Sequence, residues 1–231
     1  MSPFLVDGLA DAWHRASEED QSSAANLCGI CRRLPPPYAR AIAYGGYDGN
    51  LRSLIHLLKY DGVHPAATTL GRMLATVLNR LEASFEPKAE QLLLISVPLH
   101  RSKRWQRGFN QSESIVRAAL KQVASPNRFE LRTNLLVRQR ATTSQIGLTR
   151  HQRRRNLRGA FAVIEPGIVA GRDVILVDDV LTTGTTASEC ARVLRRAGAA
   201  RVHVATVART LKLNFSWEGA SEQSTSVRAV A

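Results

Sequence analysis

The segment that decides the fold of this chain reads Asp173-Val174-Ile175-Leu176-Val177-Asp178-Asp179-Val180-Leu181-Thr182-Thr183-Gly184-Thr185-Thr186. Val174 to Val177 form a short apolar run rich in β-branched residues, which is typical of a parallel strand buried on both faces. Apolar residues then recur at helical spacing from Ala187 to Ala197, just before Gly198. The segment therefore predicts a strand, a tight turn and a helix, as in an open α/β sheet.

The residues between this strand and this helix suit a phosphorylated sugar. Asp178 and Asp179 come at the carboxyl end of the strand, where ligands bind in open α/β sheets. Their carboxylates can accept hydrogen bonds from vicinal hydroxyls and help to hold Mg²⁺ through water. The turn offers a phosphate unpaired N–H groups and the positive end of a helix dipole, and it consists of Thr182, Thr183, Gly184, Thr185 and Thr186. The alternative is a plain strand–turn–helix with two solvated aspartates. A P-loop is excluded, because G-x-x-x-x-G-K-[ST] occurs nowhere in the sequence.

Composition is that of a globular protein with a substantial core. The chain has 231 residues, of which 44% are hydrophobic, and its apolar runs fall far short of the roughly 18 residues of a membrane helix. The first residues show no basic stretch followed by a long apolar one, so we expect no secretory signal. Three cysteines do not make a disulfide framework, and we expect a cytoplasmic location.

Positive charge is concentrated in the middle of the chain. The formal net charge is +13, and residues 101–158 hold fifteen Lys and Arg against two acids, Glu113 and Glu130. Such a stretch can meet a diphosphate or a nucleic-acid backbone, and the alternative is a solvated basic surface.

The N-terminal region is predicted to be an appendage. Residues 1–37 are expected to form a helix and a linker, with Pro35 to Pro37 as the boundary to a main domain at 38–215 and a flexible tail at 216–231. Cys28 and Cys31 form a C-x-x-C pair, which could supply half of a tetrahedral zinc site. The only other cysteine, Cys190, falls inside the predicted phosphate-binding helix, so the pair can equally be an incomplete site.

Further elements are expected along the main domain. Strands are predicted at 92–97, 131–137, 161–164 and 202–207, a short hairpin at 41–47, and helices at 50–60 and 65–81. Asn110 is expected to cap a helix, with Glu113 at its N3 position. Lys59 is equally consistent with a phosphate ligand and with a surface lysine.

Two basic segments are candidates for anion binding. His100, Arg101, Ser102 and Lys103 form a polar loop after the strand at 92–97, where a pyrophosphate could be held. The segment 138–158 has no buried-strand pattern and is expected to be a lid or a disordered stretch; it includes Gln145, Arg153, Arg154 and Arg155.

The segment at 173–186 resembles the phosphoribosyl pyrophosphate (PRPP) motif of type I phosphoribosyltransferases, and residues 28–210 resemble the ComF family, which is linked in some bacteria to DNA uptake during natural competence. The family resemblance rests on the motifs Cys28-Gly29-Ile30-Cys31, Leu58-Lys59-Tyr60, Val97-Pro98-Leu99-His100, Arg107-Gly108-Phe109-Asn110-Gln111, Gln145, Arg155-Asn156, Gly159-Ala160-Phe161 and the PRPP motif.

The resemblance implies a twisted, mostly parallel sheet flanked by helices and an N-terminal zinc ribbon, although this chain has one C-x-x-C pair where two are usual. It also implies that Asp178 and Asp179 hold the ribose hydroxyls and a metal-linked water. Residues 182–186 would cradle the 5′-phosphate, residues 100–103 would face the pyrophosphate, and residues 138–158 would close over the site.

Two functions remain open. The first is an enzyme that transfers ribose 5-phosphate from PRPP, with Mg²⁺, to a nitrogenous acceptor and releases pyrophosphate. The second is a non-catalytic competence accessory that binds single-stranded DNA through the basic 101–158 surface, although Trp105, Phe109 and Phe129 are few aromatic residues for such binding. Neither the acceptor nor the oligomeric state follows from the sequence.

Overall fold

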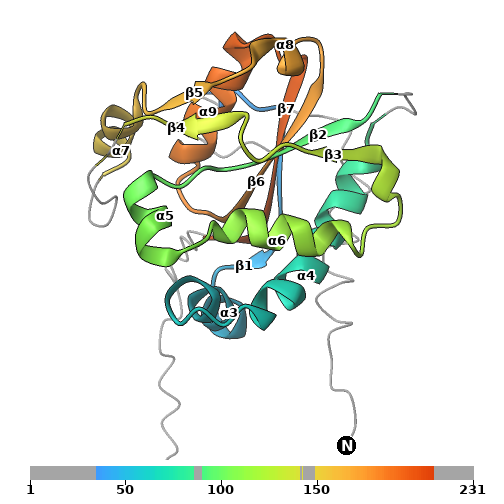
Figure 1. The fold of residues 1–231 in the computed structure, drawn as a ribbon, viewed down its shortest axis with the longest axis vertical. Coiled ribbons are helices and arrows are strands. Elements are labelled where there is room, and N and C mark those ends of the chain that lie inside the picture. Colours follow the sequence, from blue (N-terminus) through green and yellow to red (C-terminus); the bar gives the residue numbers. More distant parts are fainter. Residues whose placement is uncertain (1–34, 86–89, 141, 143–148, 211–231) are drawn as a thin grey trace, which may run out of the picture.

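A five-stranded parallel sheet forms the centre of the molecule (Figure 1). The computed structural model describes residues 35–85, 90–140, 142 and 149–210. In spatial order the strands are β1 (Arg40–Gly46), β7 (Arg201–Arg209), β6 (Asp173–Leu181), β2 (Leu92–Ser96) and β3 (Phe129–Leu131), and every neighbouring pair is parallel. Their carboxyl ends therefore lie along one edge of the sheet. The predicted fold, a parallel sheet flanked by helices, is confirmed.

Helices cover both faces of this sheet (Figure 1). One face packs against α3 (Gly49–Tyr60), α4 (Pro65–Glu82) and α6 (Gln111–Leu120), and its core includes Leu94, Ile175 and Val177. The other face packs against α8 (Pro166–Val169) and α9 (Thr185–Arg196), and its core includes Leu93, Val174 and Leu176. Successive residues of one strand thus enter opposite cores, which is why these strands are apolar throughout.

The contact between α4 and α6 depends on a glycine. A Cβ atom on Gly71 would lie 2.6 Å from the Cβ of Ala118 and 2.9 Å from its carbonyl carbon. Any larger residue would force these helices apart. This contact holds α6, and with it Ser112, at a fixed position against the sheet.

The remaining elements surround α9 or follow β2. A two-stranded antiparallel sheet consists of β4 (Leu136–Arg138) and β5 (Phe161–Val163), next to α7 (Arg150–Leu157). The short helix α5 (Arg101–Arg107) follows β2, and a 3-10 turn spans Pro126–Arg128. None of the helices in the described part of the chain is long and apolar enough to cross a membrane.

Two strand predictions were wrong. The segment 41–47, expected to be a hairpin, belongs to the parallel edge strand β1. A two-residue hairpin turn needs residues with positive φ, and neither Gly45 nor Gly46 has a positive φ. The expected strand at 131–137 is divided between β3 and β4, because the polar residues Arg132, Thr133 and Asn134 separate two apolar stretches that pair in different sheets.

Two predicted loops contain helices. Residues 101–107 form α5, whose start is capped by the His100 side chain. Residues 150–157 form α7, which starts with a capping box between Thr149 and Gln152. The predictions for residues 1–34, for Gln145 and for the tail at 216–231 lie outside the described residues.

Candidate active site at the carboxyl edge of the sheet

The aspartate pair lies in the second half of β6, and the strand continues beyond it to Leu181. Asp178 is half-buried, and its Oδ1 accepts hydrogen bonds from Ser112 Oγ of α6 at 3.0 Å and from the Asp179 backbone N–H at 2.9 Å. Asp179 is 4% exposed, and its Oδ1 accepts a hydrogen bond from the Val180 N–H at 2.9 Å. The pair is therefore held by backbone and by a neighbouring helix.

Lys59 is the counter-ion of this pair. From the last turn of α3 its Nζ forms an ion pair with Asp179 Oδ2, and the two side chains are 17% and 5% exposed. Of the two roles considered for Lys59, a surface lysine does not fit a side chain that is 17% exposed, and a phosphate ligand stays a prediction. Among the described groups, Lys59 is the one polar contact of Asp179 Oδ2.

The electrostatics of the site follow from one buried and one half-buried acid that face one base. Burial, with Asp179 alongside, raises the pKa of Asp178 to about 8. Burial lowers the pKa of Lys59, but the attraction and hydrogen bond of Asp179 outweigh this, so its pKa is raised. Two acids thus share one base, so ionising Asp178 at neutral pH costs free energy that a bound cation or a set of hydroxyl donors would offset.

The turn after β6 has the geometry of an anion cradle. Gly184 has φ 70° and is the N-cap of α9, so the backbone turns sharply into the helix. A Cβ atom there would lie 3.1 Å from Tyr38 Oη. Thr183 Oγ1 and Thr185 Oγ1 are 2.8 Å apart, and Thr182 is exposed. The first N–H groups of α9 and the threonine hydroxyls thus face the same turn.

The predicted pyrophosphate residues lie at the neighbouring strand end. Val97, directly after β2, bonds through its N–H to the Val177 carbonyl of β6, so residues 100–103 start close to the aspartate pair. The His100 ring nitrogen Nδ1 lies 2.7 Å from Ser102 Oγ, and Lys103 Nζ donates to Gln106 Oε1 at 3.2 Å. Arg101 is exposed. Three of the four side chains thus have contacts within the α5 region.

The predicted lid arginines belong to a different groove. Arg154 and Arg155 of α7 line a groove of about 480 Å³, together with Arg158 and residues of α9 that include Thr185, Arg192 and Arg196. Thr185 also belongs to the anion cradle, so the groove adjoins the candidate site. Arg153 is half-buried on α7, whereas Gln145, Cys28 and Cys31 lie outside the described residues.

Ser112 was not predicted as a site residue. It follows the cap residue Asn110, whose side chain accepts from the Ser112 N–H at 3.1 Å and donates to the Val97 carbonyl at 3.1 Å. The predicted capping by Asn110 is confirmed, but Glu113 pairs with Arg117 instead of completing a capping box. In the sequence, Ser112 cannot be told apart from an ordinary residue of a first helical turn.

Comparisons with known proteins agree with this arrangement. Residues 132–221 match the phosphoribosyl transferase domain model. The chain is 38% identical over 188 residues to DNA utilization protein YhgH from Escherichia coli O157:H7, covering 80% of this chain and 78% of that protein. It is 31% identical over 186 residues to competence protein F from Haemophilus influenzae, covering 80% and 79%.

A solved structure of glutamine PRPP amidotransferase from B. subtilis, complexed with ADP and GMP, is 26% identical and covers 62% of this chain and 26% of that one, with a TM-score of 0.35. Because this overlap is loose, the fold assignment rests on the strand order and the domain model. The relatives cover most of the chain, and the domain model spans the aspartate pair and the anion cradle. The chain therefore belongs to the ComF family, that of competence protein F and DNA utilization protein YhgH, and it has the type I phosphoribosyltransferase fold.

Proposed function

We propose that this protein binds PRPP with Mg²⁺ at the carboxyl edge of the sheet and transfers ribose 5-phosphate to a nitrogenous acceptor, releasing pyrophosphate. One observation carries the proposal: the adjacent acids Asp178 and Asp179 come shortly before the Gly184 turn and the N-terminus of α9. Hydroxyl-accepting carboxylates and a phosphate-binding helix start thus lie within a few residues of each other, as a ribose 5-phosphate requires.

The roles proposed for the residues follow from their chemistry. Asp178 and Asp179 accept hydrogen bonds from the two ribose hydroxyls. The backbone N–H groups and hydroxyls of residues 182–186 bind the 5′-phosphate. Arg101 and Lys103, at the end of the neighbouring strand, bind the pyrophosphate, with His100 and Ser102 shaping the start of α5.

The residues present fit Mg²⁺. Magnesium is held in such sites by one or two carboxylates together with waters and substrate phosphates. Asp179 Oδ2 is a buried oxygen whose only polar contact is with Lys59, and the described residues contain no cluster of three or more His, Cys, Asp or Glu side chains that would make a protein-only cage. Bound Mg²⁺ would neutralise charge on the pyrophosphate as it leaves. Zinc at Cys28 and Cys31 remains a prediction from the sequence.

Transfer is tested by measuring pyrophosphate release from PRPP with Mg²⁺ and a panel of nitrogenous acceptors. We expect release that requires an acceptor and falls at least about 100-fold in Asp179→Asn, as typically follows the loss of one charge-stabilising group. Asp173→Asn, at the opposite end of the same strand, is the matched control and keeps full activity. PRPP binding without release on any acceptor would reduce the function to ligand binding.

A second candidate function is single-stranded DNA binding, and the arginine groove between α7 and α9 favours it. The groove is lined by five arginines, Arg154, Arg155, Arg158, Arg192 and Arg196. Its lining includes one acid, Glu189, which forms an ion pair with Arg192. The basic 101–158 segment is therefore divided: its α7 part joins α9 in this groove, and its α5 part borders a separate pocket. Two relatives carry names that refer to DNA utilization and competence.

DNA binding is tested by fluorescence anisotropy of a single-stranded oligonucleotide against salt. We expect the logarithm of the association constant to fall linearly with the logarithm of the salt concentration. The slope should be about 0.7 for each counterion that is released. Arg154→Ala with Arg155→Ala should reduce this slope, whereas the control Arg52→Ala with Arg80→Ala removes the same charge from α3 and α4 and should not. Salt-independent binding, or equal effects of both pairs, would contradict a groove-specific site.

A further inference from the structure

The arginine groove between α7 and α9 is long enough for a row of anions. Its lining residues recur every three or four positions on each helix, so they lie along one face of α7 and one face of α9. They are His151, Arg154, Arg155 and Arg158 on α7, and Thr185, Ser188, Glu189, Arg192 and Arg196 on α9. At about 1.5 Å per residue, the α9 side extends over about 17 Å from Thr185 to Arg196. A single small anion would occupy only part of this length.

The lining carries more positive charge than its own acid balances. Five arginines and one glutamate leave a net charge of +4 with His151 neutral, and no other acid is among the described residues that line the groove. Glu189 accepts hydrogen bonds from Arg192 Nε and from the Gly159 N–H, each at 2.9 Å. Burial opposes the ionisation of Glu189, but these hydrogen bonds outweigh it and lower its pKa. The acid is thus paired within the groove wall, and the charge that remains favours an anionic ligand.

The groove runs into the anion cradle through two separate segments. Thr185, the first residue of α9, lines the groove, and its Oγ1 lies 2.8 Å from that of Thr183 in the cradle. Residues Pro35 to Pro37 also line the groove. The next residue, Tyr38, has its Oη 3.1 Å from the position that a Cβ of Gly184 would occupy. One ligand can therefore extend from the groove into the cradle.

The two parts of this surface suit two kinds of phosphate. Arginines along the groove match phosphodiesters, each of which carries one negative charge. Among the described lining residues His151 has the one aromatic ring, so binding in the groove should depend little on base sequence. At the start of α9, the N–H groups and the helix dipole favour the more highly charged phosphate monoester, about −1.5 to −2 at pH 7. A nucleic-acid strand that ends in a phosphate offers both kinds in the matching order.

We propose that the groove and the cradle form one site for a single-stranded nucleic acid that ends in a phosphate. The terminal phosphate lies in the cradle and the phosphates that follow it lie in the arginine groove. The inference rests on the second candidate function, single-stranded DNA binding, and adds to it the end that is recognised. The first sugar lies on the groove side of the cradle, so the strand makes no use of Asp178 and Asp179.

The proposal makes the strand end and PRPP compete. Both place a phosphate monoester in the cradle at Gly184, so they exclude each other there. A strand without a terminal phosphate uses the groove alone and can bind beside PRPP. Bound PRPP should therefore cancel the advantage that a terminal phosphate gives, and no more than that.

The test is fluorescence anisotropy of single-stranded oligonucleotides of one sequence. Strands with a 5′-phosphate or a 3′-phosphate are each compared with the same strand that has a hydroxyl at that end and a dye at the other. One phosphorylated strand should bind about tenfold more tightly than its hydroxyl counterpart, because the terminal phosphate gains charge-assisted hydrogen bonds. PRPP with Mg²⁺, at about a hundred times its Kd, should raise the Kd of that strand to the Kd of the hydroxyl strand. The hydroxyl strand should be unaffected.

Three variants separate the parts of the site, with PRPP binding measured by titration calorimetry. Gly184→Ala should remove the preference for the phosphorylated end and also weaken PRPP binding, because both use the cradle. Asp179→Asn should weaken PRPP binding alone. Arg154→Ala with Arg155→Ala should weaken both kinds of strand and leave PRPP binding unchanged. Gly171→Ala is the matched control, since Gly171 also has a positive φ, 76°, but lies outside the cradle.

Three results overturn the inference: equal binding of phosphorylated and hydroxyl ends, no effect of bound PRPP on the phosphorylated strand, or equal end preference in Gly184→Ala and Gly171→Ala. The first two are measured on the wild type and do not depend on a variant that folds. If no strand binds at all, the second candidate function falls together with this inference. Failure of the wild type to bind PRPP overturns the proposed transfer instead, and the end preference and its loss in Gly184→Ala then decide the inference.

Discussion

The two edges of the sheet differ in how their acidic side chains are paired with cations. At the amino edge every acid described here has a cation beside it: Asp173 pairs with Arg201 at 2.8 Å, and Arg172 pairs with Glu130 at 2.6 Å and with Glu90 at 3.2 Å. At the carboxyl edge the two adjacent acids Asp178 and Asp179 share one lysine.

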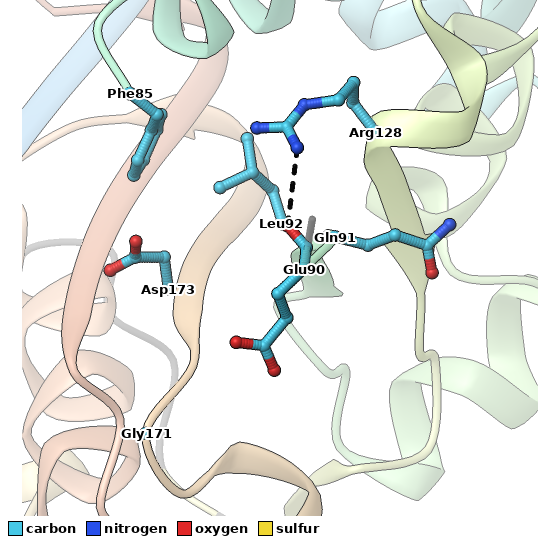
Figure 2. Close-up of a pocket in the computed structure, with 7 residues that line it drawn as sticks. All are labelled: Phe85, Glu90, Gln91, Leu92, Arg128, Gly171 and Asp173. Atoms are coloured by element: carbon cyan, nitrogen blue, oxygen red, sulfur yellow. Dashed lines mark hydrogen bonds between the residues drawn. The ribbon is translucent and has the colours of Figure 1, made fainter. Parts of the chain in front are cut away.

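The pockets at the two edges also differ in volume. Figure 2 shows the pocket at the amino edge, whose lining includes Glu90, Asp173 and Arg128. Its volume is about 20 Å³, which is roughly enough for one water molecule. The carboxyl edge opens into a pocket of about 210 Å³, whose lining includes Lys59, Lys103 and Arg107. Acids that are paired with cations stabilise the fold, whereas an acid with a raised pKa and no cation of its own is suited to a ligand. The difference supports the proposal that the carboxyl edge is the ligand site.

The largest expected effect on stability comes from removing the one cation of the carboxyl edge. Lys59→Met should lower the free energy of unfolding by about 3 kcal/mol, because it leaves Asp179 buried and unpaired. Urea denaturation at pH 7 measures this. Lys121→Met, at an exposed position, is the control. A loss below about 1 kcal/mol would mean that the ion pair with Asp179 contributes no more than a surface pair.

The second effect concerns pH and a histidine near the amino edge. Burial, and to a lesser degree Arg201, lowers the pKa of His203 to about 4, and both of its ring nitrogens lack a hydrogen-bond partner among the described groups. The folded protein therefore holds this histidine neutral, while the unfolded chain takes up a proton below its ordinary value of 6.5.

Stability from His203 is thus full above pH 6.5 and is lost as the pH falls towards 4, by at most about 2 kcal/mol at pH 5. Denaturation of wild type and His203→Leu at pH 7 and pH 5 measures the difference. The variant should lose less stability between the two pH values than the wild type. An equal loss in both would show that His203 is not the titrating group.

A third, smaller effect separates backbone strain from ligand binding. Gly184→Ala and Gly171→Ala each put a side chain at a positive φ, 70° and 76°, and each should cost about 1 kcal/mol of stability. Only Gly184 lies in the anion cradle, where a Cβ would also approach Tyr38. PRPP affinity, measured by equilibrium dialysis, should fall in Gly184→Ala and stay unchanged in Gly171→Ala. Equal affinities would remove the cradle from the PRPP site.

The smallest effect is expected from breaking an amino-edge pair. Asp173→Asn should cost less than about 1 kcal/mol, because its partner Arg201 is 47% exposed and such pairs are screened by solvent. Its denaturation curve in urea checks this value. A cost as large as that of Lys59→Met would mean that the two edges do not differ as described.

Sequence patterns predicted the central fold well, because the signal was local. The runs at 92–96, 174–177 and 202–207 are apolar at every or nearly every position, and all three form central strands. The edge strand β1 has a weak pattern with two glycines and was mistaken for a hairpin. The helix α7 is so rich in arginine that no apolar face marks it, and it depends on the capping box at Thr149 and on packing against α9.

The site was predictable in its composition but not in its contacts. Asp178, Asp179 and residues 182–186 are consecutive, so their proximity follows from the sequence. Lys59 pairs with Asp179, and Ser112 pairs with Asp178. These residues come from α3, α6 and β6, which only the folded chain brings together. For the same reason the pocket between the end of α3 and α5 could not be predicted from either segment alone.

Thermal denaturation with and without PRPP and Mg²⁺, on three proteins, tests most directly whether the carboxyl edge is the ligand site. The proteins are the wild type, the double variant Asp178→Asn with Asp179→Asn, and Asp173→Asn, and each must first show a cooperative unfolding transition. Ligand at about a hundred times its dissociation constant should stabilise the wild type and Asp173→Asn by roughly 2.7 kcal/mol and leave the double variant unchanged. Equal stabilisation of all three proteins, or of none, would contradict a PRPP site at Asp178 and Asp179.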